Sequence, residues 1–369
     1  MMNREGQRRE SQLAFLQSGQ DILIGDAKQL PLSIAQLQNS SIDSDYVRNY
    51  FSDGLTAQVF KLQAGGSAWT LKLKREQSLV KNVDGQTSFL NEVQRRRDFQ
   101  LLKNDQSKAA FFHHVVDTEY ASFQQGILLS PWIEGEILQT FNERVLTQLF
   151  STLVQFELHG FMEWDLCPGN ILDDGKSVHL FDFGYCYRFD PLTEFNSNGI
   201  KDPLFHCAER LETRNFFAHL LNLQSTSGEN AVFALFELEK RLALQAYQFK
   251  YSELKRRGAS QTILAWTQGI IKRWQEALQS RVTLEDLLVI EGYRSHLIDL
   301  YDDLHGQSCT EMTLKRVDVI ESILTEQFDL LVKNKGLFFG DEEKTQQQLL
   351  ARVREHRQQA IQFQLSAQR

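Results

Sequence analysis

Three oxygen-bearing side chains lie around two short apolar runs in the segment GFMEWDLCPGNILDDGKSVHLFDFG, residues 160–184. The runs ILD and SVHLFDF favour β-strands, and the Asp-Gly pair between them is a strong hairpin signal. Asp165 and Asn170 precede the first predicted strand, and Asp182 lies near the end of the second. Because a hairpin brings the start of its first strand near the end of its second, we expect these side chains to converge. Carboxylate and amide oxygens at one place suit a hard cation bound to phosphate oxygens.

The composition predicts a soluble globular protein with a substantial core. The chain has 369 residues, of which 42% are hydrophobic, and this length allows two domains. Its four cysteines are scattered without a CxxC pair, so we predict neither a zinc site nor a disulfide scaffold. A reducing compartment such as the cytoplasm fits best.

Charge and hydropathy argue against two classes of partner. The formal net charge is -8, whereas a dedicated nucleic-acid binder normally needs a basic surface to neutralise phosphates. No apolar segment approaches the length of a signal-peptide core or of a membrane span. We therefore expect no nucleic-acid partner, no cleaved secretion signal and no membrane span.

Prolines and periodicity divide the chain into two regimes. All five prolines lie at or before Pro203, and from about Cys207 onward long helical periods are followed by Gly258, Gly306 and Gly336. We therefore predict that the second half is all-helical.

The first half is predicted to contain a small sheet and at least one helix. The segment VFKLQAGGSAWTLKLK alternates on both sides of a Gly-Gly pair, GILLSPWIEGE is a short apolar run, and TSFLNEVQRRRDFQLLK has a helical pattern. Residues 1–45 are polar and Gln-rich, so we expect a loosely ordered extension there. The chain is thus predicted to be α+β, with an extension at 1–45, a sheet-containing domain at 46–135 and a helical domain at 136–369.

Two charged positions have more than one interpretation from pattern alone. In SAWTLKLKRE, strict alternation places Lys72 and Lys74 on the same face of a strand, so periodicity cannot choose between them. Glu92 and Arg96, in the predicted helix, have the spacing of an ordinary surface i,i+4 ion pair.

The order of these features resembles the protein-kinase-like fold: a glycine-containing hairpin, a strand lysine, a helix glutamate, an apolar run, and then the segment 160–184. The match covers roughly residues 50–190. Its densest part, GFMEWDLCPGNIL, resembles the catalytic-loop pattern H-R-D-L-K-P-E-N-I-L and its variant H-G-D-L-H-P-G-N. The ending PGN and the stretch DGLTAQVFKL are most similar to aminoglycoside phosphotransferases and choline kinases. This resemblance implies a bilobal fold with a small N-terminal antiparallel-sheet lobe and a larger, mostly α-helical C-terminal lobe.

The resemblance also implies roles for the matching residues. Asp165 would be the catalytic base that accepts the proton of a hydroxyl acceptor. Asn170 and Asp182 would hold Mg²⁺ against the β- and γ-phosphates of ATP. Of the two lysines, the family strand pattern selects Lys72 as the contact to the α- and β-phosphates, with Glu92 as its ion-pair partner on the helix.

Nucleotide-binding positions follow from the same resemblance. Gly54 aligns with the middle glycine of the phosphate-binding loop, where small residues replace the outer two and still let backbone amides approach phosphate oxygens. The Pro131 carbonyl and the Ile133 amide would accept from and donate to the adenine. Trp132 between them is more simply a packed aromatic residue.

The chain departs from the family pattern around the catalytic loop. Glu163 and Trp164 replace the usual His-Arg or His-Gly, and Cys167 replaces the customary Lys or His. No A-P-E motif follows the DFG sequence. We interpret Glu163, Asp173 and Asp174 as loop and turn residues without a role in the chemistry.

These patterns predict an ATP- and Mg²⁺-dependent phosphotransferase that moves the γ-phosphoryl group to a hydroxyl acceptor, with a small molecule favoured over a protein. The alternatives are an atypical protein Ser/Thr kinase and a nucleotide-binding pseudokinase that serves as an interaction module; related folds also transfer nucleotides. The acceptor is not identifiable from the sequence. The acidic cluster Asp299, Asp302 and Asp303 in the helical half is predicted to be a solvated helix face.

Overall fold

The chain folds into two compact units, seen in a computed structural model that describes residues 4–52, 54, 56–80 and 82–365. The predicted α+β class is confirmed, with a sheet in the N-terminal part and a helical C-terminal part. Segment 148–207, which the sequence analysis assigned to the helical domain, groups with the sheet. The first unit comprises the chain up to Leu138, Gln148–Cys207 and Arg256–Ile263, and the second comprises Gln139–Thr147, Ala208–Lys255 and the chain from Leu264 onward.

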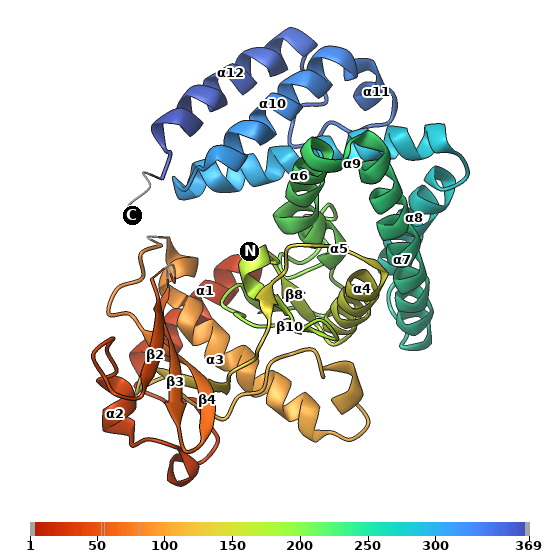
Figure 1. Cartoon of the computed structure of the whole chain (residues 1–369). Helices are drawn as coiled ribbons and strands as arrows, with labels where there is room; N and C mark the ends of the chain where they lie inside the picture. The colour runs from red at the N-terminus through yellow and green to blue at the C-terminus, as the bar shows by residue number, and fades with distance from the viewer. Residues whose placement is uncertain (1–3, 53, 55, 81, 366–369) are drawn as a thin grey trace. The chain divides into compact units, whose positions relative to one another are not determined.

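A six-stranded antiparallel sheet organises the N-terminal part of the first unit, in the order β1-β5-β6-β4-β3-β2. The predicted Gly-Gly hairpin is confirmed, because β3 and β4 pair continuously up to the turn (Figure 1). The strands are β1 (Leu23–Ile24), β2 (Val47–Phe51), β3 (Ala57–Ala64), β4 (Ser67–Lys74), β5 (Tyr120–Ser122) and β6 (Ile127–Pro131), and the helices around them are α1 (Arg4–Ser18), α2 (Ile34–Gln38) and α3 (Val83–Asn104).

Both faces of this sheet are covered by apolar side chains. On one face, Leu71 and Leu73 of β4 pack in a cluster that includes α2. On the other, Leu128 of β6 packs with Phe89 and Val93 of α3. Since side chains alternate along a strand, the β4 residue between the two leucines must face α3.

The N-terminal segment forms regular structure, so the expectation of a loosely ordered extension over residues 1–45 is wrong for its described part. Residues 4–18 form α1, and β1 adds an edge strand to the sheet. Arg8 and Arg9 pair with Asp84 at the start of α3, at 2.9 and 2.8 Å, and the Phe15 ring lies 5.8 Å from that of Phe123. These contacts join positions far apart in sequence, which no local pattern within the extension records.

The remainder of the first unit consists of two small sheets and a buried aromatic cluster. The predicted hairpin across Asp174 and Gly175 is confirmed, because β9 and β10 pair antiparallel. Phe99 of α3 packs against Phe161 and Phe183 with ring centroids 4.8 Å apart, which fixes the hairpin region to the helix. The elements are α4 (Glu143–Leu158), β7 (Glu136–Ile137), β8 (Phe161–Glu163), β9 (Ile171–Asp173), β10 (Val178–Leu180), β11 (Cys186–Arg188), and 3-10 helices at Ala27–Gln29, Ala109–Phe111 and Pro168–Asn170.

The second unit is helical, as predicted. One of its apolar clusters joins α9, α10 and α12, and Figure 1 shows α10 and α12 side by side. Across the described part of the chain, none of the helices combines the length and the apolar character that crossing a bilayer requires. The helices are α5 (Cys207–Leu211), a π-helical turn (Glu212–Phe216), α6 (Phe217–Ser227), α7 (Glu229–Arg256), α8 (Gln261–Ala277), α9 (Arg281–Gly306), α10 (Glu311–Glu326), α11 (Phe328–Lys333) and α12 (Gln346–Gln362).

The acidic cluster of α9 is not a fully solvated face, so that prediction is wrong for Asp299. Asp299 is buried and pairs with Arg316 at 2.7 Å. Asp302 is half exposed and lies 3.3 Å from Arg210. Burial, together with the charge of Asp299, raises the pKa of Asp303 to about 6. The cluster is therefore part of an ion-pair network inside the second unit.

Candidate functional site

The first unit contains a cavity of about 490 Å³ whose walls come from the large sheet, from α3, from the small sheet β10-β9-β7 and from the turns that carry Asp165 and Asp182. Its lining includes apolar side chains such as Val59, Leu128 and Leu172, and a volume of this size is typical of small-ligand sites. Four predicted residues line it together: Lys72, Asp165, Asn170 and Asp182. The expected convergence of these side chains is therefore observed.

Lys72 is buried between two carboxylates. Its ammonium nitrogen lies 2.9 Å from Glu92 Oε2 and 2.8 Å from Asp182 Oδ2. Burial disfavours the charged ammonium, but the charges of Asp182 and Glu92 outweigh this and hold the pKa of Lys72 above its ordinary value. Burial likewise disfavours the Asp182 carboxylate, yet Lys72 holds the pKa of Asp182 below its ordinary range. Lys72 and Asp182 are therefore both charged near neutral pH.

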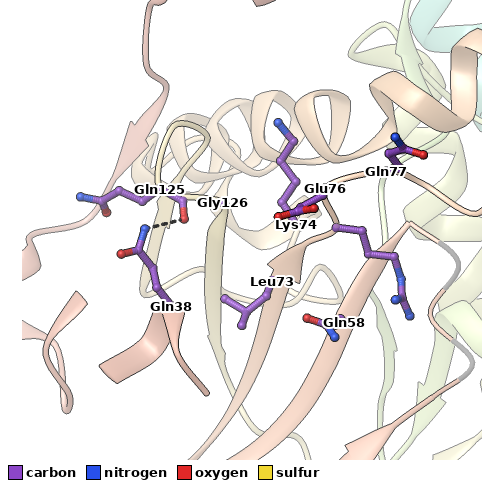
Figure 2. A pocket seen from close by; sticks show the side chains of 9 residues that line it. Gln38, Gln58, Leu73, Lys74, Glu76, Gln77, Gln125 and Gly126 are labelled. Atoms are coloured by element: carbon purple, nitrogen blue, oxygen red, sulfur yellow. Dashed lines mark hydrogen bonds between the residues drawn. The ribbon is translucent and has the colours of Figure 1, made fainter. Parts of the chain in front are cut away.

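The other lysine, Lys74, has different surroundings. It is exposed, its ammonium lies 4.4 Å from the centroid of the Phe123 ring, and burial of its stem lowers its pKa. It lines a separate, open cavity of about 720 Å³, together with polar side chains such as Gln38 and Gln125 (Figure 2). The structure thus places Lys72, and not Lys74, beside Glu92 and Asp182.

Glu92 connects Lys72 to a second buried cation. Its Oε1 accepts a hydrogen bond from Arg96 Nη2 at 3.2 Å, and Arg96 Nη1 donates to the Val116 carbonyl at 3.3 Å. The i,i+4 pair therefore exists, but both side chains are buried and Arg96 lines the cavity, so the surface interpretation is wrong. Glu92 is held from one side by α3 itself and binds Lys72 from the other.

Asp165 and Asn170 lie in the turn between β8 and β9. Asn170 Nδ2 donates to the Asp165 main-chain carbonyl at 2.9 Å and to its Oδ2 at 3.4 Å. Pro168 begins the 3-10 turn that carries Asn170, and its fixed φ suits a first helical position. Because the amide nitrogen is thus occupied, the amide oxygen is the atom through which Asn170 would bind a cation.

Glu163 is a site residue that the sequence analysis classed with the loop. It ends β8, opposite Cys186 of β11, and its buried Oε1 accepts a hydrogen bond from the Asp165 N–H at 2.9 Å. Burial, with the negative charges of Asp165 and Asp182, raises the pKa of Glu163 well above its ordinary value. Its place two residues before Asp165, where the protein-kinase-like pattern that the sequence resembles has histidine, was the available signal. Asp173 and Asp174, by contrast, do lie at the β9–β10 turn.

The backbone of Asp182 adopts the left-handed conformation, with a φ of 65°. For a residue with a Cβ this conformation costs of the order of 1 kcal/mol and persists only where neighbours enforce it. Here it accompanies a carboxylate that contacts Lys72 and lines the cavity. Such a conformation at a site with a buried ion pair is typical of functional positions.

The predicted phosphate-binding loop is described only in part, because Asp53 and Leu55 lie outside the described residues. Gly54 lines the cavity, and its carbonyl accepts two hydrogen bonds from the Arg75 guanidinium, at 3.0 and 2.8 Å. A Cβ at this position would lie 2.3 Å from the Ala57 carbonyl oxygen. Gly54 is therefore required by close backbone approach at the edge of the cavity.

The predicted adenine-binding residues lie at the end of β6 and just after it. The Trp132 N–H donates to the Ala68 carbonyl of β4 at 3.0 Å, and strand alternation then turns the Pro131 carbonyl and the Ile133 N–H away from β4. Pro131, Trp132 and Ile133 all line the cavity. Trp132 also stacks on Phe51 with ring centroids 6.0 Å apart, so it is packed as predicted.

A divalent cation would find oxygen ligands here but not a complete cage. Among the described residues, no group of three or more His, Cys, Asp or Glu side chains is arranged to hold a metal ion. The Asp182 carboxylate and the Asn170 amide oxygen supply two hard ligands in one cavity, which fits a cation that takes its other ligands from phosphate and water. No protein-family model matches the sequence of this chain, and no curated protein sequence matches it either.

Proposed function

We propose that the protein is an ATP- and Mg²⁺-dependent phosphotransferase with the bilobal protein-kinase-like fold. It transfers the γ-phosphoryl group of ATP to a hydroxyl acceptor. One observation carries the proposal: a buried lysine contacts two carboxylates, Glu92 and Asp182, within a single cavity that Asp165 and Asn170 also line. A purely structural ion pair would not need the further polar residues or the adjoining apolar space.

The charges of the cavity support a polyphosphate ligand. Lys72 is held in its charged form and fixed by Glu92, so it can meet phosphate oxygens without first losing a flexible conformation. Asn170 and Asp182 would hold the Mg²⁺ ion, which when bound would offset negative charge on the transferring phosphoryl group. The apolar residues of the lining, among them Pro131 and Ile133, would contact the adenine.

Asp165 is the residue best placed to receive a proton. Its backbone is fixed by Glu163 and Asn170, and its carboxylate lines the cavity. A hydroxyl group is a weak nucleophile, and a positioned carboxylate aids it by orienting the O–H and accepting the proton as the new bond to phosphorus forms. The Asn170 contact keeps one oxygen of Asp165 oriented while the other faces the acceptor.

A small-molecule acceptor agrees best with the departures from the protein-kinase pattern. Cys167 lines the cavity where protein kinases commonly have a lysine, and no A-P-E motif follows Asp182. A thiol supplies no positive charge to the γ-phosphate, so Lys72 and the metal ion would carry that task.

The test is incubation of the purified protein with γ-labelled ATP and Mg²⁺, first alone and then with a metabolite pool and with a cell lysate. We expect label in small molecules, and the Asp165→Asn variant as a control should give none. Label in protein would indicate a protein kinase instead. Binding of ATP without transfer would indicate an interaction module, and transfer from α-labelled ATP in a parallel reaction would indicate nucleotidyl transfer.

A further inference from the structure

The residue next to Glu92 on α3 holds the chain segment that follows Asp182. Asn91 is 1% exposed, and its side-chain nitrogen donates to the main-chain carbonyls of Phe183, Gly184 and Cys186, at 3.1, 3.0 and 2.8 Å. Two hydrogens of one amide are thus shared by three carbonyls of a segment that runs between β10 and β11. These carbonyls are buried with the side chain, so each needs a donor to offset its lost hydration.

The same segment lies directly on α3. A Cβ placed at Gly184 would come within 3.2 Å of the Ser88 Cβ, so glycine permits this approach. The Phe183 ring packs against Phe99, which lies about three turns after Ser88 on α3. Three contacts therefore hold residues 183–186 on α3: the close approach of Gly184 to Ser88, the packing of the Phe183 ring on Phe99, and the hydrogen bonds of the Asn91 amide.

This anchoring acts one residue away from a strained position. Asp182 has a left-handed backbone, and such a conformation persists only where the flanking chain is fixed. Residue 181 is fixed on the other side, since the Phe181 N–H donates to the Asn170 carbonyl at 3.2 Å. Freeing the Asn91 side would let the backbone of Asp182 relax to a more common conformation and turn its carboxylate away from Lys72.

We propose that Asn91 is a positioning residue of the site, which sets the direction of the Asp182 carboxylate by holding residues 183–186 on α3. Its role in metal binding rests on the function proposed above, whereas its role in holding the segment does not. Glu92 and Asn91 are neighbours, so one turn of α3 fixes both the partner of Lys72 and the backbone that presents Asp182.

Two variants on the same helix separate positioning from simple loss of stability. Asn91→Leu keeps a similar volume and removes the amide. Thr87→Val is the matched control, because Thr87 is equally buried on α3 but directs its hydrogen bonds to Gln12 and to its own helix. Thermal unfolding of both variants measures the general cost. If Asn91→Leu does not fold, Asn91→Ser replaces it, since it removes the amide without adding bulk.

The first readout is hydrogen exchange of the amides of residues 182–186 in the protein without nucleotide. We expect exchange about tenfold faster in Asn91→Leu and unchanged in Thr87→Val, because losing the hydrogen bonds of a buried amide lowers the free energy of local opening of this segment. Wild-type exchange rates in Asn91→Leu would overturn the proposal, whether or not the protein binds nucleotide.

The second readout is the Mg²⁺ concentration that gives half-maximal binding of a fluorescent ATP analogue. Asn91→Leu should raise it by about tenfold, with Thr87→Val as wild type. Added to Asp182→Asn, the Asn91→Leu change should produce no further loss; an additive loss would show that Asn91 does not act through Asp182 and would overturn the proposal. A wild-type protein without Mg²⁺-dependent nucleotide binding would refute the proposed function, and the exchange measurement would still decide the role of Asn91.

Discussion

Replacing Lys72 by methionine removes the cation between two carboxylates while keeping a side chain of similar length. Asp182 then loses the ammonium that lies 2.8 Å from its Oδ2. Glu92 keeps its ion pair with Arg96, in which Nη2 lies 3.2 Å from Oε1. Breaking a buried ion pair by removing one partner costs about 3–5 kcal/mol. Because the Asp182 side chain is 33% exposed and Glu92 retains a partner, we expect the low end, about 3 kcal/mol.

The matched control is Lys74→Met, two residues along the same strand. Lys74 is exposed and its ammonium makes a cation–π contact with the Phe123 ring. Losing this contact should lower the free energy of unfolding by at most about 1 kcal/mol. Hydrogen exchange of the β3 and β4 amides at increasing urea concentration gives the opening free energy of the first unit for each variant. Equal costs for the two variants, or a larger cost at Lys74, would refute the assignment of the ion pair.

The same pair predicts a pH dependence with a definite sign. Burial disfavours the charged form of Asp182, but Lys72 more than compensates and depresses its pKa. A carboxyl with a depressed pKa stabilises the fold above its ordinary pKa, and this contribution is lost as the pH falls through the lowered value. The stability difference between wild type and Lys72→Met should therefore be full at pH 7 and shrink below about pH 4.

Three further predictions follow from other groups. Asp165→Asn should leave Mg²⁺-dependent nucleotide binding close to wild type and remove phosphoryl transfer, whereas Asp182→Ala should abolish the binding itself; unchanged turnover in Asp165→Asn would exclude the proposed base. Burial raises the pKa of Glu239 in the second unit to about 8, so its stabilising contribution is lost as the pH rises through that value. Thermal unfolding should show Glu239→Gln gaining stability relative to wild type between pH 6 and pH 9, and parallel curves would contradict this. Asp84→Asn should expose α1 to limited proteolysis, because it weakens the ion pairs with Arg8 and Arg9; an unchanged cleavage rate would show that the other contacts of α1 hold it in place.

Local sequence patterns predicted the elements that carry the site. The β3–β4 hairpin follows from strict alternation around two glycines, and the β9–β10 hairpin follows from the Asp-Gly turn. Both signals depend on residues a few positions apart, which is the range over which turn chemistry and strand periodicity act. The helix that carries Glu92 was predicted on the same basis.

Features set by tertiary contacts were not predicted. Arg96 reads as a surface residue because a helix-spacing rule does not reveal that the helix is covered on that side. Glu163 reads as a loop residue because its partner, the Asp165 N–H, becomes significant only when β8 is paired with β11. The polar composition of residues 4–18 concealed a helix whose ion pairs lie on Asp84. In each case the role of the side chain depends on a partner that is either far away in the sequence or a backbone group. A local pattern of residue types shows neither.

The placement of α1 has a consequence for the order in which the chain folds. Residues 19–82 separate α1 from α3, so during synthesis Phe15 emerges well before Phe89 and Phe123, the residues of the cluster it joins. At translation rates of about 5–20 residues per second, this interval lasts for seconds. An isolated helix of this length is marginal in water, so α1 has nothing to stabilise it until its partners are made. The helix that comes first in the described chain therefore becomes stable only after α3 and Phe123 have been made, and slowing synthesis between residues 19 and 123 would prolong the time for which its apolar side chains face the solvent.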